Sequence, residues 1–154
     1  MAKVTILCGI PCSGKTTYCK KFPEFDVISR DAIRIVFFEK DYQYTDVNEN
    51  RVTTIFKKLF EESVKEKKDI ILDNTHCKEK YLNDAIKLVP DNYEMEVVFL
   101  NTPLWKAYIR NVWRYMWTKK WVPFGIIAQM KKNFDKIDKK KYEMVQQRLS
   151  FRTL

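Results

Sequence analysis

One segment of the sequence has the residue types and spacing that suit phosphate binding. Residues 9–16, Gly-Ile-Pro-Cys-Ser-Gly-Lys-Thr, match the pattern G-x-x-x-x-G-K-[ST] without deviation. Glycines allow backbone conformations that exclude side chains, so successive N–H groups can point at phosphate oxygens. The lysine offers a flexible positive charge to the terminal phosphates, and the last hydroxyl can ligate Mg²⁺. This segment predicts a nucleoside triphosphate site made by Gly9, Cys12, Ser13, Gly14, Lys15, Thr16 and Thr17.

Two carboxylates follow expected strands and could take part in chemistry at this site. Asp73 comes directly after the apolar run Ile70-Ile71-Leu72, the pattern of the Walker B acid that holds a metal ion directly or through water. The alternative for Asp73 is a helix N-cap. Asp31 precedes Arg34 by three residues, so the two share one face of an expected helix. Asp31 could accept the proton of a substrate hydroxyl while Arg34 binds an anionic substrate. In the alternative, Asp31 only caps the helix and forms a surface ion pair with Arg34.

A later helix carries two arginines at the spacing that puts them on one face. Arg110 and Arg114 are four residues apart, and the same helix carries Trp113 and Trp117. Phosphoryl transfer needs positive charge on the oxygens between donor and acceptor, often from an arginine on a moving segment. The break at 121–123 suits a hinged lid. In the alternative interpretation the tryptophans are core residues and the arginines lie at the solvent-exposed edge of this core. We expect about half of the tryptophans to be core residues.

Hydrophobic periodicity predicts the elements that must position these residues. Short apolar runs predict strands at 4–8, 25–29, 70–73 and 95–100, and helical spacing predicts helices at 13–21, 30–40, 52–64, 80–89 and from 103 onward. Ile33, Val36 and Phe37 are expected to form the buried face of the second helix. Strands that alternate with helices imply a parallel sheet of about four strands flanked by helices. We therefore expect an α/β P-loop kinase fold with a helical lid and a helical C-terminus.

Length and composition restrict the class of protein. The chain has 154 residues, of which 45% are hydrophobic and 32% are charged, as in a globular domain. We expect a single domain over 1–154, with the lid at about 103–123. No run approaches the ~18 apolar residues of a membrane span, and the N-terminus lacks the layout of a secretory signal. We expect a cytoplasmic protein without membrane contact, in the host cytoplasm if the source is viral.

The positive charge is a local feature of the last third of the sequence. The formal net charge is +9, and residues 106–154 contain 13 Lys or Arg against 3 Asp or Glu. All four tryptophans lie between residues 105 and 121, so basic and aromatic side chains occur together. The four cysteines form no C-x-x-C pair, and the single histidine, His76, has no partner at zinc spacing. Free thiols are the expected state of the cysteines.

Taken together, these motifs resemble a known kinase family. The P-loop, Ser-Arg-Asp31-Ala-Ile-Arg34, Ile-Leu-Asp73-Asn-Thr and Pro103 through Arg110-Asn-Val-Trp-Arg114 are similar to the 5′-hydroxyl polynucleotide kinase domain of bacteriophage and bacterial RNA-repair enzymes. The likeness runs in order over about residues 3 to 130. The P-loop is generic, whereas its distance from Arg-Asp-x-x-Arg and the later Arg-x-x-x-Arg are typical of this family. Cys12 is a departure, because a glycine is frequent at that position.

The resemblance implies a role for each matching residue. Lys15 and Thr16 would bind phosphate and Mg²⁺, and Asp73 would orient the metal or the acceptor region. Asp31 would be the general base and Arg34 the clamp on the 3′ phosphate of the acceptor. Arg110 and Arg114 would contact donor phosphates from the lid, so the residues implied in catalysis are Asp31, Lys15 and Arg114.

The activity implied is transfer of the γ-phosphate of ATP, or of another nucleoside triphosphate, to the 5′-hydroxyl end of DNA or RNA, with Mg²⁺ as cofactor. Two alternatives stay open. A P-loop kinase of a small metabolite or nucleoside would share the donor chemistry but has no need of a basic, tryptophan-rich segment. A nucleotide-dependent binding module would hydrolyse or bind the nucleotide without phosphorylating an acceptor.

Overall fold

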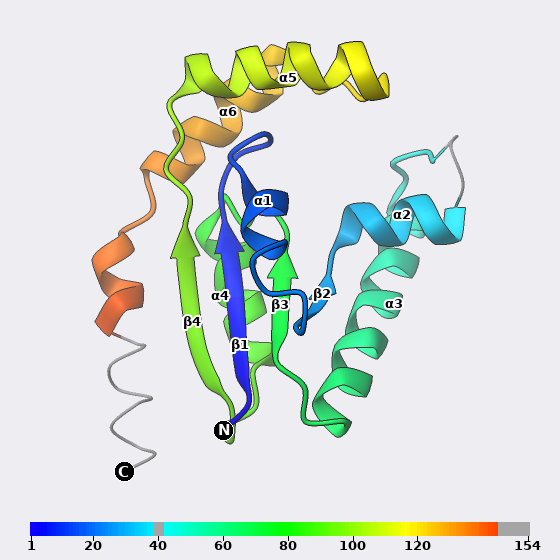
Figure 1. Cartoon of the computed structure of the whole chain (residues 1–154), viewed down its shortest axis with the longest axis vertical. Coiled ribbons are helices and arrows are strands. Elements are labelled where there is room, and N and C mark those ends of the chain that lie inside the picture. The colour runs from blue at the N-terminus through cyan, green and yellow to red at the C-terminus, as the bar shows by residue number, and fades with distance from the viewer. Residues whose placement is uncertain (39–41, 145–154) are drawn as a thin grey trace.

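A four-stranded parallel sheet forms the centre of the computed structural model, which describes residues 1–38 and 42–144. The strands are β1 (Lys3–Cys8), β2 (Asp26–Ile28), β3 (Ile70–Asp73) and β4 (Glu94–Phe99), in the order β2-β3-β1-β4. In the register, Val4 of β1 lies opposite Ile70 of β3 and Met95 of β4. All strands point the same way, so their carboxyl ends meet at one edge (Figure 1). The predicted parallel sheet of about four strands is confirmed.

Alternate side chains of the strands build two cores of unequal size. Leu7 and Ile71 point to one face, where they pack with Cys19 of α1 (Lys15–Cys19). Val4 and Leu72 point to the other face, toward α3 (Asp46–Lys65) and α4 (Glu79–Leu88), and belong to a larger cluster that includes Phe56 and Leu82. An apolar run without polar alternation is the pattern of a strand that is covered on both faces. The uninterrupted sequence of β1 and β3 follows from this burial.

Helices beyond the carboxyl edge of the sheet form a second feature of the fold. After β2 comes α2 (Arg30–Phe38), and after β4 come α5 (Leu104–Thr118) and α6 (Phe124–Asp135). Figure 1 shows α5 crossing above the carboxyl ends of the strands, from the β4 side toward the α2 side. Proline N-caps start α5 and α6, because the fixed φ of proline suits a helix start. The predicted break between the two helices is confirmed.

Two expectations about burial are wrong. Ile33 of α2 is 3% exposed, but Val36 and Phe37 are 73% and 55% exposed. The inner side of this helix is completed instead by Phe38, packed on Tyr42, and by an ion-paired arginine described below. All four tryptophans are exposed, with values from 44% to 78%, so none is a core residue. The indoles lie on α5 and the turn after it, and the side of α5 that packs on the body carries Ala107 and Asn111.

No described helix combines the length and the apolar composition that a membrane crossing requires.

Candidate active site

The P-loop follows β1 and turns directly into α1, as its spacing predicts. A Cβ atom at Gly9 would lie 2.5 Å from Ser13 Oγ and 3.2 Å from Leu100 Cβ, so a side chain there would force its neighbours to move. Gly14 has φ +99°, a conformation that L side chains rarely adopt. Cys12 also has a positive φ, 63°, although it carries a side chain. This left-handed backbone explains why glycine suits position 12, and its cost with a side chain is about 1–2 kcal/mol.

Lys15 folds back over the loop that precedes it. Its Nζ donates to Gly9 O at 3.0 Å and to Ile10 O at 2.9 Å. Burial lowers the pKa of Lys15, while the nearby carboxylates of Asp73 and Asp31 act in the opposite direction. The ammonium group is therefore bound by neutral carbonyl oxygens of the loop, and an anion that binds in the loop could form an ion pair with it.

Thr16 and Asp73 carry the side-chain oxygens that the sequence predicts as metal ligands. Thr16 is exposed in the first turn of α1, and Asp73 ends β3 beside β1. Burial raises the pKa of Asp73, and the charge of Lys15 lowers it. Because the N-cap of α4 is Lys78, Asp73 does not cap that helix, which removes one alternative for this residue.

These residues fit a Mg²⁺ ion that is shared with substrate phosphates. Magnesium usually keeps several waters and takes one or two protein oxygens beside the phosphates, so it does not need a cage of carboxylates. Residues 1–38 and 42–144 hold no cluster of three or more His, Cys, Asp or Glu that could form such a cage. One half-buried carboxylate, Asp73, and one exposed hydroxyl, Thr16, are a donor set of the size that a shared ion requires.

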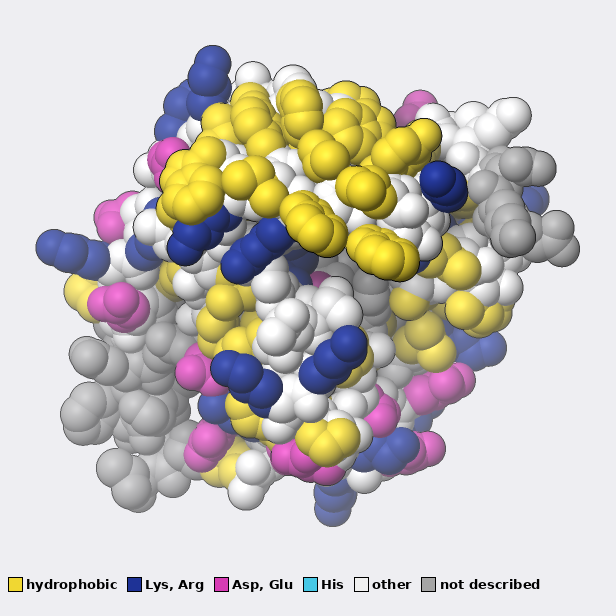
Figure 2. All heavy atoms as spheres, turned by 45° about the horizontal axis from the view of Figure 1, so that its top comes forward, with side chains coloured by type: hydrophobic (Ala, Val, Ile, Leu, Met, Phe, Trp, Pro, Cys, Tyr) yellow, Lys and Arg dark blue, Asp and Glu magenta, His cyan; other side chains and the backbone are white. Residues whose placement is uncertain are grey.

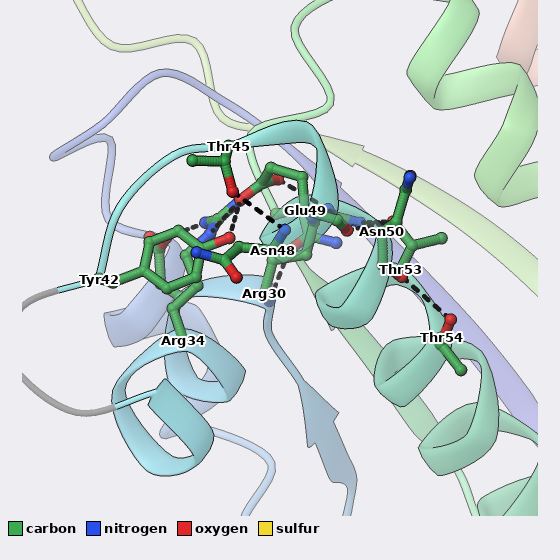
Figure 3. A network of polar contacts seen from close by, with 11 residues as sticks. Arg30, Arg34, Tyr42, Thr45, Asn48, Glu49, Asn50, Thr53 and Thr54 are labelled. Atoms are coloured by element: carbon green, nitrogen blue, oxygen red, sulfur yellow. Dashed lines mark hydrogen bonds and ion pairs between the residues drawn. The ribbon is translucent and has the colours of Figure 1, made fainter.

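A network of ion pairs joins α2 to α3 and centres on Glu49 (Figure 3). Arg34 donates from Nε to Glu49 Oε1 at 3.0 Å and from Nη2 to Oε2 at 2.9 Å. Arg30 Nη2 donates to Oε2 at 2.9 Å, and Tyr42 OH donates to Oε1 at 2.6 Å. Burial alone would raise the pKa of Glu49, but these hydrogen bonds lower it to about 2. Glu49 could not be found from the sequence, because Arg34 and Glu49 are fifteen residues apart on separate helices and share no local pattern.

Asp31 occupies the open end of this network. Arg34 Nη1 donates to Asp31 Oδ1 at 2.6 Å, and the Asp31 side chain is 83% exposed. The shared helix face and the surface ion pair are therefore both present. Asp31 influences the pKa of Lys15 and of Asp73, so its carboxylate lies within electrostatic range of the P-loop. Arg30 N donates to Asn74 Oδ1 at 3.0 Å, which fixes the start of α2 against the end of β3.

The two arginines of α5 occupy different environments. Arg110 is exposed, and its Nη1 donates to Cys12 O of the P-loop at 3.2 Å. Arg114 is half-buried and donates from Nη2 to Asn111 Oδ1 at 3.1 Å. The buried Nε of Arg114 has no hydrogen-bond partner among the described residues. The structure thus brings Arg110 to the P-loop and packs Arg114 against the inner side of α5.

Asn111 ties α5 to the turn before α6. Its side chain is completely buried, donates to Val122 O at 2.7 Å and accepts from Val122 N at 3.3 Å. Both hydrogen bonds use the backbone of one residue, so the amide closes the α5–α6 turn. Thr102 Oγ1 donates to Ser13 O at 3.1 Å, which fastens the segment before α5 to the P-loop. Neither contact has a signal in sequence spacing.

Buried thiols and one imidazole line the underside of the P-loop. All four cysteines are free, as expected from the sequence. Cys8 Sγ donates to His76 O at 3.1 Å, and His76 Nδ1 lies 2.7 Å from Leu7 O. Burial lowers the pKa of His76 to about 4, so the ring is neutral at neutral pH. This histidine is a structural residue, which agrees with its lack of a metal-ligand partner in the sequence.

The geometry places a P-loop, a carboxylate at a strand end and a lid arginine around one carboxyl edge, and the sequence agrees with that architecture. Residues 4–137 match the AAA domain family. The chain belongs to this family. No curated protein matches the sequence at a significant level.

Solved structures place this AAA domain among kinase-type P-loop folds. One chain of the Pnkp1/Rnl/Hen1 RNA repair complex superposes with a TM-score of 0.80 and 22% identity, over 87% of this chain and 44% of that chain. A second structure of the Pnkp1/Rnl/Hen1 complex gives a TM-score of 0.64 and 23% identity, over 71% and 39%. A gluconokinase from Sinorhizobium meliloti gives 0.52 and 14% identity, over 85% and 74%.

At these identities the likeness concerns the fold, and at that level the predicted resemblance to a polynucleotide kinase-type P-loop domain is confirmed. The AAA domain spans less than half the length of the RNA-repair chains that it matches.

Proposed function

We propose that this AAA domain is a kinase that transfers the γ-phosphate of ATP to the 5′-hydroxyl end of a nucleic acid. The observation that carries the proposal is the position of Asp31. Its exposed carboxylate stands at the carboxyl end of β2, within electrostatic range of Lys15, and is oriented by Arg34 at 2.6 Å. A base placed there could meet a hydroxyl that enters from solvent while the donor lies on the P-loop.

In the proposed reaction the hydroxyl oxygen attacks the γ-phosphorus as its proton passes to Asp31, and the bond to the β-phosphate oxygen breaks to release ADP. Lys15 turns from the loop carbonyls to the donor phosphates, and Arg110 adds positive charge from α5. Thr16 and Asp73 would hold Mg²⁺, which supplies charge neutralisation on the phosphate oxygens when bound. Arg114, with its unpaired buried Nε, is the second lid arginine in this scheme.

Arg34 is not free to bind an acceptor phosphate in this structure, because its three nitrogens already donate hydrogen bonds to Glu49 and Asp31. An acceptor phosphate could reach it only by replacing one of these carboxylates. The contact to Asp31 is the most open of the three, so a phosphate that binds Arg34 would also free the base. A 5′-hydroxyl oligonucleotide carries such a phosphate one step from the reacting oxygen, whereas a plain nucleoside does not.

The alternative is a P-loop kinase of a small metabolite, and the likeness to a gluconokinase over 85% of this chain favours it. The two proposals differ in the acceptor and share the donor chemistry.

The test is incubation with γ-labelled ATP, Mg²⁺ and a panel of acceptors: a 5′-hydroxyl oligonucleotide, a nucleoside 3′-monophosphate, a nucleoside and several sugars including gluconate. We expect the oligonucleotide and the nucleoside 3′-monophosphate to be phosphorylated and the nucleoside to be poor. Arg34→Ala should narrow that difference by harming the phosphate-bearing acceptors. Acceptor affinity should fall as salt rises, since phosphate contacts release counterions. Preferred phosphorylation of a sugar, without salt dependence, would favour the metabolite kinase.

A further inference from the structure

Four exposed side chains form one stripe on α5, which we term the lid stripe. Lys106, Arg110, Trp113 and Trp117 are spaced at i, i+4, i+7 and i+11, so they lie on one face of the helix. Arg110 Nη1 donates to Cys12 O of the P-loop at 3.2 Å, so this member of the stripe reaches the phosphate cradle. The lid stripe therefore borders the candidate active site.

The two indoles of the lid stripe are exposed beyond what packing explains. Trp113 is 59% exposed and Trp117 is 78% exposed, whereas Trp121 packs on the ring of Phe124 with centroids 4.9 Å apart. Large exposed aromatic surface on a helix generally marks an interaction site. Figure 2 shows hydrophobic side chains gathered over the top of the molecule, where α5 lies, with Lys and Arg side chains directly below them.

The surrounding charge indicates that the partner is an anion. Residues 104–134 contain seven Lys or Arg and no Asp or Glu. Cations at one helical turn from flat aromatic rings suit a strand in which phosphates alternate with bases, because every base offers a face for stacking. A membrane surface would also attract cations and tryptophans. A strand that begins at the candidate active site also accounts for the hydrogen bond between Arg110 of the lid stripe and the P-loop, whereas a membrane surface does not.

We propose that the lid stripe is a stacking platform for the acceptor strand. Trp113 and Trp117 lie against bases beyond the first nucleotide and Lys106 lies against a phosphate of the strand, while Arg110 stays at the donor phosphates on the P-loop. The direction of α5 supports this order, because the helix runs from the β4 side toward the side of α2, which carries Asp31 (Figure 1). The inference rests on the proposed function and adds that the acceptor is bound as a single strand several nucleotides long.

The test compares Trp113→Leu and Trp117→Leu with wild type on two acceptors, a nucleoside 3′-monophosphate and an oligonucleotide of several nucleotides. Leucine keeps an apolar side chain but removes the ring. Each substitution should raise KM for the oligonucleotide about tenfold, with KM for ATP and for the mononucleotide unchanged. Fluorescence anisotropy of a 3′-labelled oligonucleotide without ATP should show the same loss of affinity.

Met116→Ala is the matched control, because Met116 is 60% exposed on the same helix but lies outside the lid stripe. It should behave as wild type, and unchanged melting temperatures show that all three variants are folded. Equal effects on both acceptors, or an effect on KM for ATP alone, would overturn the stacking platform. So would binding to phosphatidylserine vesicles that both substitutions abolish while oligonucleotide binding stays intact. If the wild type phosphorylates neither the oligonucleotide nor the mononucleotide, the proposed function itself is wrong.

Discussion

Replacing Glu49 by glutamine tests the network that holds α2 against α3. The carboxylate accepts hydrogen bonds from Arg30, Arg34 and Tyr42, which lower its pKa from the ordinary 4.5 to about 2. A tenfold change in proton affinity corresponds to about 1.4 kcal/mol, so this difference is worth about 3 kcal/mol. The Glu49 side chain is 32% exposed, and solvent screening reduces the expected value to about 2 kcal/mol. Glu49→Gln should therefore lower the free energy of unfolding by about 2 kcal/mol at pH 7.

The pH dependence of this loss follows from the direction of the shift. A carboxylate with a lowered pKa stabilises the fold fully above the unfolded pKa, and this stabilisation disappears as pH falls from about 4.5 toward 2. Urea unfolding, followed by circular dichroism, should show a wild-type advantage over Glu49→Gln that is constant from pH 8 to pH 6. The advantage should shrink to roughly 1 kcal/mol by pH 3.5.

Glu61→Gln is the control, since Glu61 is exposed on the same helix, α3. An exposed substitution of this kind changes stability by less than about 0.5 kcal/mol. Two results would refute the reasoning: equal stability of Glu49→Gln and Glu61→Gln at pH 7, or a Glu49 difference that does not vary below pH 4.5. The variant also matters for activity, because the amide of glutamine has a single acceptor oxygen and Arg34 would lose at least one of its two hydrogen bonds to this position. We expect its KM for the acceptor to rise.

Four further predictions concern single positions. Lys15→Ala should reduce phosphoryl transfer about 100-fold or more, because it removes charge from the donor phosphates; near wild-type turnover in the labelled-ATP assay would contradict the site. Asp31→Asn should lose turnover with ATP affinity nearly intact, and a collapse of ATP binding measured by calorimetry would exclude Asp31 as the base. Asn111→Ala should lower the free energy of urea unfolding by about 2 kcal/mol, since it leaves both backbone groups of the half-buried Val122 without their hydrogen-bond partner; a loss below 0.5 kcal/mol would show that the turn does not depend on this amide. Burial lowers the pKa of His76 from the ordinary 6.5 to about 4. As pH falls from 6.5 to 4, the imidazole is therefore protonated in the unfolded chain but not in the folded one, and the free energy of unfolding decreases. Urea titrations should show a decrease of about 3 kcal/mol in the wild type and none in His76→Asn.

Local features of the sequence predicted most of the fold. The strand at residues 70–73 was predicted to the residue, because an uninterrupted apolar run ends there at a carboxylate. The P-loop was also predictable, since its glycines and its lysine act within eight residues of one another. The buried face of α2 was predicted wrongly at Val36 and Phe37. Periodicity shows that apolar residues share a face, but it does not say that the face is covered.

Contacts between distant elements could not be predicted. Glu49 neutralises Arg30 and Arg34 from another helix, and the buried amide of Asn111 bonds to backbone atoms of the next turn. About half of the tryptophans were expected to be core residues, since indoles usually bury a large apolar surface. Their exposure depends on how α5 is rotated, and that rotation is set by Ala107 and Asn111 on its inner side.

The order of the strands has a consequence for how the chain folds. The strand that leads into the P-loop, β1, is the first to be made, but its neighbours in the sheet are β3 and β4. Val4 pairs with Ile70 and Met95, so the base of the loop has no strand partner on one side until β3 has been synthesised, and none on the other side until β4 follows. Pairing over such sequence distances is slow, because the chain loses the entropy of loop closure before the stabilising contacts between the strands form. The phosphate cradle therefore forms late, and a nucleotide that binds it stabilises the completed sheet and no earlier intermediate.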